Sequence, residues 1–524
     1  MPLKIFILII NLTLAFPVSS APPTTAIEWL QDEKPLPNKI PHPARLYKTI
    51  PDNIIIPITT TTLKPNNFNS IGIIPSEITG INPRIWSSIT EDAISFQLNS
   101  LPYLHFSTAR TFLKRVLITE TNAPLDSLTS IKKGKLYLFS KLDKLIEIGA
   151  LDEAETLISL VPKLDKDVFN RWSKVSLLTG RLTKMCKTLV RKPELSSDLS
   201  LRIICFARLG DWQAAALILA TASTLGKISN NREQLLIRYL DPNLFIDNQT
   251  HSQNSNLDEI DFYIKTTSQQ YNGIRNNKPK YSYRELNSNS SLDGKIIAAE
   301  ILTISKSING SVLFDIYRNS IVDKSEEHWT RIETIQDLDS ALNTVNKLKV
   351  STALKHAISE MHSYNLLVPF AKEYAAKLSY FDAHANQTEL NDEYATIFVL
   401  ANDLPDNWTK YKAKNEFINL ALDVLKQRIL TPQTIEMAIQ LTKSKQKYGK
   451  FDTSKENNTP NKKPMVQKSR GSDIMESLRL SANGTRTTSQ NLYESLITLI
   501  KINELALAKS LLIEYLIGYS RNKI

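Results

Sequence analysis

The sequence predicts an all-α protein, an α-solenoid of helix-pair repeats with disordered insertions, and three observations carry this prediction. Glycine is rare, with 14 residues in a chain of 524, whereas enzymes built on parallel sheets use glycine freely in tight turns and phosphate-binding loops. The 42% hydrophobic content is high enough for buried cores. Gly149, Gly180 and Gly210 follow each other at intervals of 31 and 30 residues, about the length of one helix-pair repeat.

The first 21 residues have the pattern of a secretory signal peptide. Lys4 precedes the uncharged stretch 5–16, and small residues ending at Ala21 offer a cleavage site. This stretch is shorter than the roughly 20 apolar residues that span a bilayer. We therefore expect a periplasmic or secreted mature chain, with an uncleaved N-terminal anchor as the alternative. Residues 22–95 are predicted to be an extended tether, because they are rich in proline and threonine.

Residues 96–243 are predicted to hold the clearest helical repeats. In each repeat one of the three glycines ends a helix, because glycine tolerates the left-handed backbone conformation. A large apolar side chain two positions later, such as Leu151 or Trp212, is expected to fill the gap between the two helices. A slim residue five positions after the glycine lets the next helix pack closely. The helices predicted around Gly149 and Gly210 span 136–148, 153–161, 201–209 and 214–225.

This turn pattern resembles a degenerate tetratricopeptide or Sel1-type array. A fourth copy is expected near the C-terminus, where Asn503 replaces glycine ahead of Leu505 and Ala508. An ordinary bundle of glycine-capped helices is the alternative, and it too is all-α. Trp172 and Trp212 are assigned to the core.

Two segments interrupt the helical pattern. Residues 244–292 are rich in Asn, Ser, Gln and Tyr and are predicted to form a flexible insertion. Residues 444–475 are predicted to be a basic disordered linker. Helical repeats are expected at 293–443, and a helix pair at 476–524. The predicted helices in these two parts span 295–307, 340–348, 353–362, 367–378, 392–400, 413–427, 434–443 and, for the last pair, 490–519.

The formal net charge of +11 is concentrated in one segment. Residues 443–470 hold nine Lys or Arg and two acids, a net charge of +7. A flexible basic segment attracts anionic lipid, lipopolysaccharide or nucleic acid. No nucleic-acid-binding fold signal accompanies it, so nucleic acid is not the expected partner. A solvated linker is the plainer interpretation.

Cys186 and Cys205 are predicted to form a disulfide. They are equally far from a point between Leu195 and Ser196, close to the centre of the loop 191–198, which joins the predicted helices 182–190 and 199–209. Residues equidistant from such a turn face each other when the helices are antiparallel, and exported proteins keep disulfides. Two buried free thiols are the alternative. A redox Cys-x-x-Cys motif is absent from the sequence.

The sequence identifies no catalytic, cofactor-binding or metal-binding residue. It lacks the Gly-x-Ser-x-Gly, P-loop, dinucleotide-binding and His-Glu-x-x-His patterns. His356 and His362 are six residues apart and fall on different faces of a helix, which does not suit a metal. Glu494-Ser495 resembles the dipeptide at the catalytic Glu of soluble lytic transglycosylases. Only 30 residues follow Glu494, fewer than a lysozyme-like domain needs.

Beyond the repeats, the order of segments resembles an uncharacterised family of Gram-negative envelope proteins with degenerate tetratricopeptide- or Sel1-like repeats. The residues that carry the resemblance are 71–83, Trp86, Cys186, 205–212, 241–245, 298–300, 329–331 and 369–371. The resemblance implies the fold and the compartment, and it implies no activity.

The favoured functional prediction is a periplasmic or secreted scaffold whose helical repeats bind an envelope protein or peptide. No cofactor is expected, and the sequence identifies no small-molecule substrate. Membrane contact is expected only through an uncleaved signal or the basic segment. The alternatives are a peptidoglycan-acting envelope enzyme and a secreted protein that binds anionic surface polymers through residues 443–470.

Overall fold

The computed structural model describes residues 68–126, 135–241, 257–267, 278–287, 290–321, 328–344, 346–384, 391–446 and 469–521. Within these ranges every regular element is a helix, and β pairing is limited to an isolated bridge between Ile74 and Thr119. The all-α prediction is therefore confirmed. The described helices belong to the compact unit Lys64–Ile524. The predicted signal peptide at 1–21 lies outside the described residues.

The helices in chain order are α1 Ser76–Thr79, α2 Glu91–Asn99, α3 Ser107–Ile118, α4 Leu136–Glu147, α5 Leu151–Ser159, α6 Lys166–Thr179, α7 Thr183–Arg191, α8 Leu199–Arg208, α9 Trp212–Thr224, α10 Asn230–Leu240, α11 Glu259–Thr267, α12 Pro279–Leu286, α13 Leu292–Ile304, α14 Gly310–Asn319, α15 Trp329–Asn343, α16 Lys347–Ser363, α17 Leu367–His384, α18 Asp392–Ala401, α19 Glu416–Lys426, α20 Pro432–Gln446, α21 Arg470–Leu480, α22 Ser489–Lys501 and α23 Leu505–Arg521. Short polar side chains begin several of them. Asp165 and Asp211, for example, accept hydrogen bonds at 3.0 Å from the amides of Val168 and Ala214, which would otherwise lack partners.

The three predicted glycine turns are confirmed by their backbone conformation. Gly149, Gly180 and Gly210 have φ angles of +81°, +79° and +91°, in the left-handed region that other residues rarely adopt. They follow the ends of α4, α6 and α8 within two residues. The residues five positions later, among them Ala154 and Ala215, are fully buried, as a close approach of the next helix requires.

Asparagine and lysine make the corresponding turns elsewhere. Asn503 has a φ of +60° between α22 and α23, as the predicted fourth copy requires, and Ala508 is fully buried. Lys306 between α13 and α14, Asn365 between α16 and α17, and Asn402 after α18 also have positive φ. Asn tolerates this conformation better than most residues. The helix-pair arrangement therefore extends beyond the copies that carry glycine.

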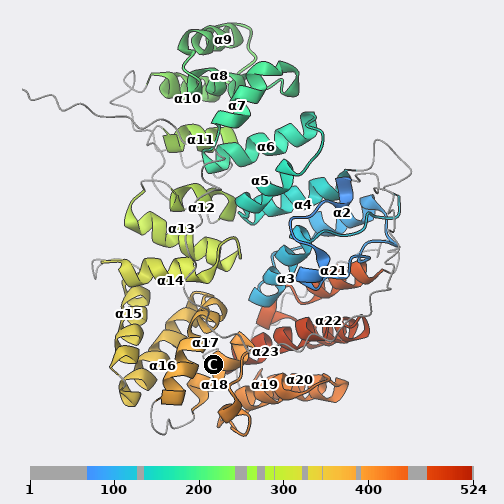
Figure 1. Cartoon of the computed structure of the whole chain (residues 1–524), viewed down its shortest axis with the longest axis vertical. Coiled ribbons are helices and arrows are strands. Elements are labelled where there is room, and N and C mark those ends of the chain that lie inside the picture. Colours follow the sequence, from blue (N-terminus) through green and yellow to red (C-terminus); the bar gives the residue numbers. More distant parts are fainter. Residues whose placement is uncertain are drawn as a thin grey trace, which may run out of the picture. The chain divides into compact units, whose positions relative to one another are not determined.

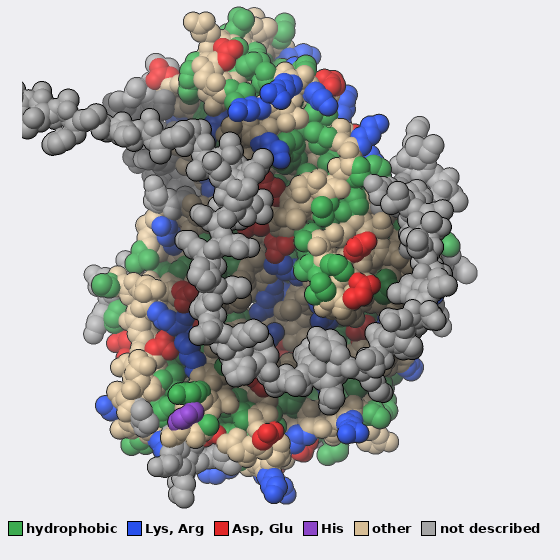
Figure 2. Space-filling model, viewed as in Figure 1, with side chains coloured by type: hydrophobic (Ala, Val, Ile, Leu, Met, Phe, Trp, Pro, Cys, Tyr) green, Lys and Arg blue, Asp and Glu red, His purple; other side chains and the backbone are tan. Residues whose placement is uncertain are grey.

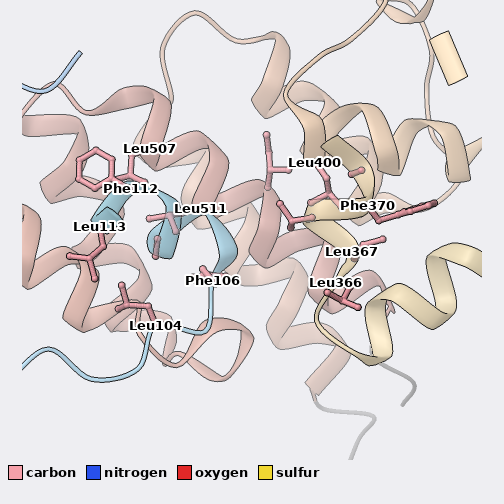
Figure 3. Close-up of a cluster of buried hydrophobic side chains, with 14 of the residues drawn as sticks. Leu104, Phe106, Phe112, Leu113, Leu366, Leu367, Phe370, Leu400, Leu507 and Leu511 are labelled. Carbon is pink, nitrogen blue, oxygen red and sulfur yellow. The ribbon is translucent and has the colours of Figure 1, made fainter. Parts of the chain in front are cut away.

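Contacts between distant segments close the series of helices into a circuit. Neighbouring helices pack together from α4 to α6, α6 packs on α12, α14 on α17, and α18 on α23. α23 then packs on α3, and α21 packs on α2 (Figure 1). Figure 3 shows Phe112 and Leu113 of α3 beside Leu507 and Leu511 of α23. Helices from the beginning and the end of the unit therefore share one core.

α6 lies between two hydrophobic cores. Val168, Val175 and Leu178 on one side of α6 join the main core, whereas Phe169 and Leu177 join a second core with α7 to α11. We call residues 182–241, which contain α7 to α10, the branch. α9 lies at the end of the branch in Figure 1. The branch therefore packs on a second core, which it shares with α6 and α11.

The tether predicted for residues 22–95 is wrong for 68–95. Ile81, Ile85 and Trp86 are buried, and α2 begins at Glu91. The apolar residues here are not spaced at a helical period, because most of them lie in turns that pack against helices from elsewhere. Residues 22–67 lie outside the described residues.

The flexible insertion predicted for 244–292 is wrong for α11 and α12. Phe262 and Ile264 of α11 and Tyr281 of α12 are buried, and both helices pack on α6. Such short helices are stabilised by tertiary packing rather than by intrinsic propensity, so a local sequence pattern detects them poorly. The ranges 242–256, 268–277 and 288–289 lie outside the described residues.

The basic linker predicted for 444–475 is wrong at both edges. α20 continues to Gln446, and α21 begins at Arg470, whose guanidinium pairs with Glu504 at 2.8 Å. The predicted C-terminal helix pair is accordingly a set of three helices, α21 to α23. Residues 447–468 lie outside the described residues.

The helix predicted for 340–348 is also wrong, since it runs across a turn. α15 ends at Asn343, and α16 begins at Lys347. Asn346 caps α16 by accepting a hydrogen bond from the amide of Lys349 at 3.1 Å. Asn is a preferred residue at helix starts, and here this local preference outweighs the apolar periodicity that predicts a continuous helix.

Candidate functional site

The two residues of the possible transglycosylase dipeptide lie on different sides of α22. Glu494 is exposed and accepts a hydrogen bond from the Gln490 amide group at 3.0 Å. Ser495 is fully buried and donates to the carbonyl oxygen of Ser477 at 2.9 Å. An exposed carboxylate on a helix surface is not enclosed as a general acid in a cleft would be.

Two further kinds of functional feature, a metal site and a membrane-spanning helix, are not found in the described residues. Within the described ranges, no three His, Cys, Asp or Glu side chains gather as a metal site would require. None of the helices in these ranges is both long enough and apolar enough to cross a membrane. The buried side-chain nitrogen of Lys141 donates to the carbonyl oxygens of Ile71 and Thr119, at 3.0 and 3.2 Å, so Lys141 joins α4 to two loops.

Cys186 and Cys205 meet inside the branch, as the sequence predicts. Their sulfur atoms are 2.08 Å apart, and both side chains are fully buried between α7 and α8. The loop 192–198 joins these helices, with the cysteines on either side of it. The covalent link therefore holds α7 and α8 together, and α9 packs on α8.

Replacing both cysteines by serine is expected to destabilise the branch selectively. Closing a loop with a sequence separation of 19 stabilises by about 3 kcal/mol in the chain-entropy model. Hydrogen exchange should therefore show faster exchange in α7 to α10, with α15 to α18 unchanged. Reducing the wild-type chain is the matched control and should give the same pattern. Equal protection in the oxidised and reduced chains would contradict this prediction.

The outer surface of α9 is the main exposed apolar surface of the branch. Trp212 is 49% exposed and Leu217 is 69% exposed, and Leu225 just beyond the helix is 64% exposed. Ala216 and Ala220 lie exposed between them. We call these five residues the α9 face. The opposite side of the helix packs on α8 and α10, and no charged residue occurs from Trp212 to Thr224.

The assignment of Trp212 to the core is wrong. The glycine turn places an apolar residue at the same position in each repeat, and Leu151 and Leu182 are buried there. In the third repeat α9 ends the branch, so its equivalent residue remains exposed. Trp172 does pack against the core, with its ring 5.9 Å from that of Phe169. The sequence signal that indicates this exposed apolar surface is the absence of charged residues along the whole of α9.

The branch that carries this face is basic. Residues 182–241 contain nine Lys or Arg and five Asp or Glu. Arg208, the last residue of α8, and Lys227 after α9 are both exposed. An apolar face within a positively charged surface complements a partner with the opposite charge.

Comparison with known proteins adds no neighbour. The chain matches no protein-family profile, no curated protein and no solved structure.

Proposed function

We propose that the chain is a non-catalytic helical-repeat scaffold of the cell envelope, periplasmic or secreted, that binds a protein partner through the α9 face. The observation that carries this proposal is the exposure of Trp212 and Leu217 on a helix without charged residues. Exposed contiguous apolar surface on a stable domain marks interaction sites, and tryptophan is enriched among the residues that dominate binding energy.

The branch is suited to hold such a surface rigidly. It packs on the second core, and the buried disulfide of Cys186 and Cys205 joins α7 to α8, the helix on which α9 packs. A surface that is already ordered loses less entropy on binding. The disulfide also supports the export proposal, because such links persist in oxidising compartments.

The partner we propose presents an apolar patch bordered by acidic side chains. Apolar contact would cover the α9 face, and acidic groups would meet the net positive charge of the branch. Such a partner is expected to associate faster at low salt, because steering by charge is screened as ionic strength rises.

The proposal is tested by crosslinking the full chain in its native envelope, followed by mass spectrometry. The expected result is one partner with crosslinks that map to the branch and to an acidic segment of the partner. Leu217→Asp is expected to weaken the complex on the order of 30-fold, as loss of a central interface residue does. Leu348→Asp is the matched control, because Leu348 is 78% exposed on α16, outside the branch. Crosslinks elsewhere, or equal effects of the two substitutions, would reject the α9 face as the docking site.

A further inference from the structure

A second candidate site lies in a pocket where three distant parts of the circuit meet. The pocket has a volume of about 480 Å³, within the range of small-molecule sites. Lys114 lines it from α3, Lys306 from the turn before α14, and Lys372 from α17. On the face of the molecule drawn in Figure 2, Lys and Arg side chains gather beside acidic ones in a central hollow.

The carboxylates near the pocket already have partners. Glu373 lines the pocket and accepts a hydrogen bond from Arg318 at 2.8 Å. Glu153 pairs with Lys114 at 2.5 Å. Glu514 accepts hydrogen bonds from two backbone amides at the start of α3. Glu373 and Glu153 are therefore already paired with cations, and Glu514 offsets only part of the positive charge in the pocket, because its effect on Lys306 is smaller than those of Arg110 and Lys372.

Lys306 and Lys372 supply that charge. In the part of the chain that the structure describes, neither ammonium group has a hydrogen-bond or ion-pair partner. The backbone of Lys306 is left-handed, with a φ of +67°, and Lys114 donates to its carbonyl oxygen at 2.9 Å. Burial, reinforced by the like charges of Arg110 and Lys372, lowers the pKa of Lys306 to about 7. Bringing an anion into the pocket would relieve this repulsion.

We propose that this pocket binds a small ligand that carries a phosphate dianion. Lysine is a compact charge with three rotatable donors, which suits a tetrahedral phosphate better than a planar carboxylate. The start of α14 lines the same pocket, so its partial positive charge adds to that of the lysines. The site is separate from the α9 face and does not rest on the proposed function.

Calorimetric titration of the full chain with inorganic pyrophosphate at constant ionic strength tests this proposal. The expected result is saturable binding with one site per chain. Lys372→Ala and Lys306→Asn should each weaken binding on the order of tenfold, because each removes a charge-assisted hydrogen bond. Asn is chosen at 306 because Asn365 and Asn402 make the corresponding left-handed turns. The matched control is Lys355→Ala, since Lys355 is exposed on α16 and does not line the pocket.

The pH dependence of sulfate binding gives a second test, because sulfate keeps its charge between about pH 5 and pH 9. Above its pKa of about 7, Lys306 must take up a proton to bind the dianion. Affinity should therefore fall on the order of tenfold from about pH 6 to pH 8.5, and the profile should be flatter in Lys306→Asn. The other charged groups that face Lys306 or the pocket are Arg110, Lys114, Glu153, Lys372, Glu373 and Glu514.

Three results would overturn the proposal. The first is the absence of saturable pyrophosphate binding by the wild-type chain. The second is an equal loss of affinity in Lys355→Ala and Lys372→Ala, which would indicate general attraction to a basic surface. The third is tighter binding of citrate than of pyrophosphate, which would assign the pocket to carboxylates. Matching thermal unfolding of each variant with the wild type establishes that a loss of binding is not a loss of folding.

Discussion

Replacing Glu300 by alanine is expected to lower the free energy of unfolding by about 3–5 kcal/mol, because it removes the carboxylate that pairs with a buried guanidinium. Glu300 on α13 accepts hydrogen bonds from the Arg331 guanidinium on α15, at 2.8 and 3.2 Å. It also accepts one from the Tyr317 hydroxyl on α14. Arg331 is only 3% exposed, so its guanidinium is shielded from bulk water.

Urea denaturation followed by circular dichroism measures this effect, and two variants control for it. Glu476→Ala removes an acid from an exposed pair with Arg479, and it should change stability by less than about 1 kcal/mol. Combining Glu300→Leu with Arg331→Met removes both buried charges and should recover most of the stability. A small effect of Glu300→Ala, similar to that of Glu476→Ala, would show that water or another group solvates Arg331.

The helix-pair turns show what local sequence can predict. A glycine at the end of an apolar-periodic stretch predicts a left-handed turn, and Gly149, Gly180 and Gly210 fulfil this because the requirement is local. At Lys306 and Asn365 the same turn is made without glycine, so a search by glycine spacing passes over it. The disulfide was predictable for the same reason, since a single short loop relates its two cysteines.

Features that depend on distant contacts were not predictable from the pattern. The α9 face is exposed because α9 ends the branch, and a repeat motif does not indicate which copy is the last. The lysines of the pocket are 192 and 66 residues apart along the chain, from Lys114 to Lys306 and from there to Lys372. They meet because the circuit brings α3 and α17 together beside α14. Closure itself arises from contacts between α3 and α23, which no local periodicity encodes.

Trp86 lies where the circuit of helices closes. Trp86→Ala should lower the free energy of unfolding by about 3–5 kcal/mol, as truncation of a buried tryptophan does. Trp86 is fully buried, with its ring 5.5 Å from that of Tyr137 on α4. It also packs on Gly471 of α21, where a β-carbon would lie 2.3 Å from the indole ring. The amide of Gly471 donates to the carbonyl oxygen of Ile85 at 3.0 Å. The indole therefore fills the contact between the first and last parts of the unit.

Trp212→Ala is the matched control, because it makes the same substitution on a side chain that is 49% exposed. It should change stability by less than about 1 kcal/mol, since little packing surrounds the ring. Denaturation should separate the two variants, and hydrogen exchange should show that Trp86→Ala increases exchange in both α2 and α21. Increased exchange in α2 alone would mean that α21 is stable without this contact, and that the circuit closes through α3 and α23 only. Equal destabilisation by the two substitutions would instead place Trp212 in a core and remove the basis of the α9 face.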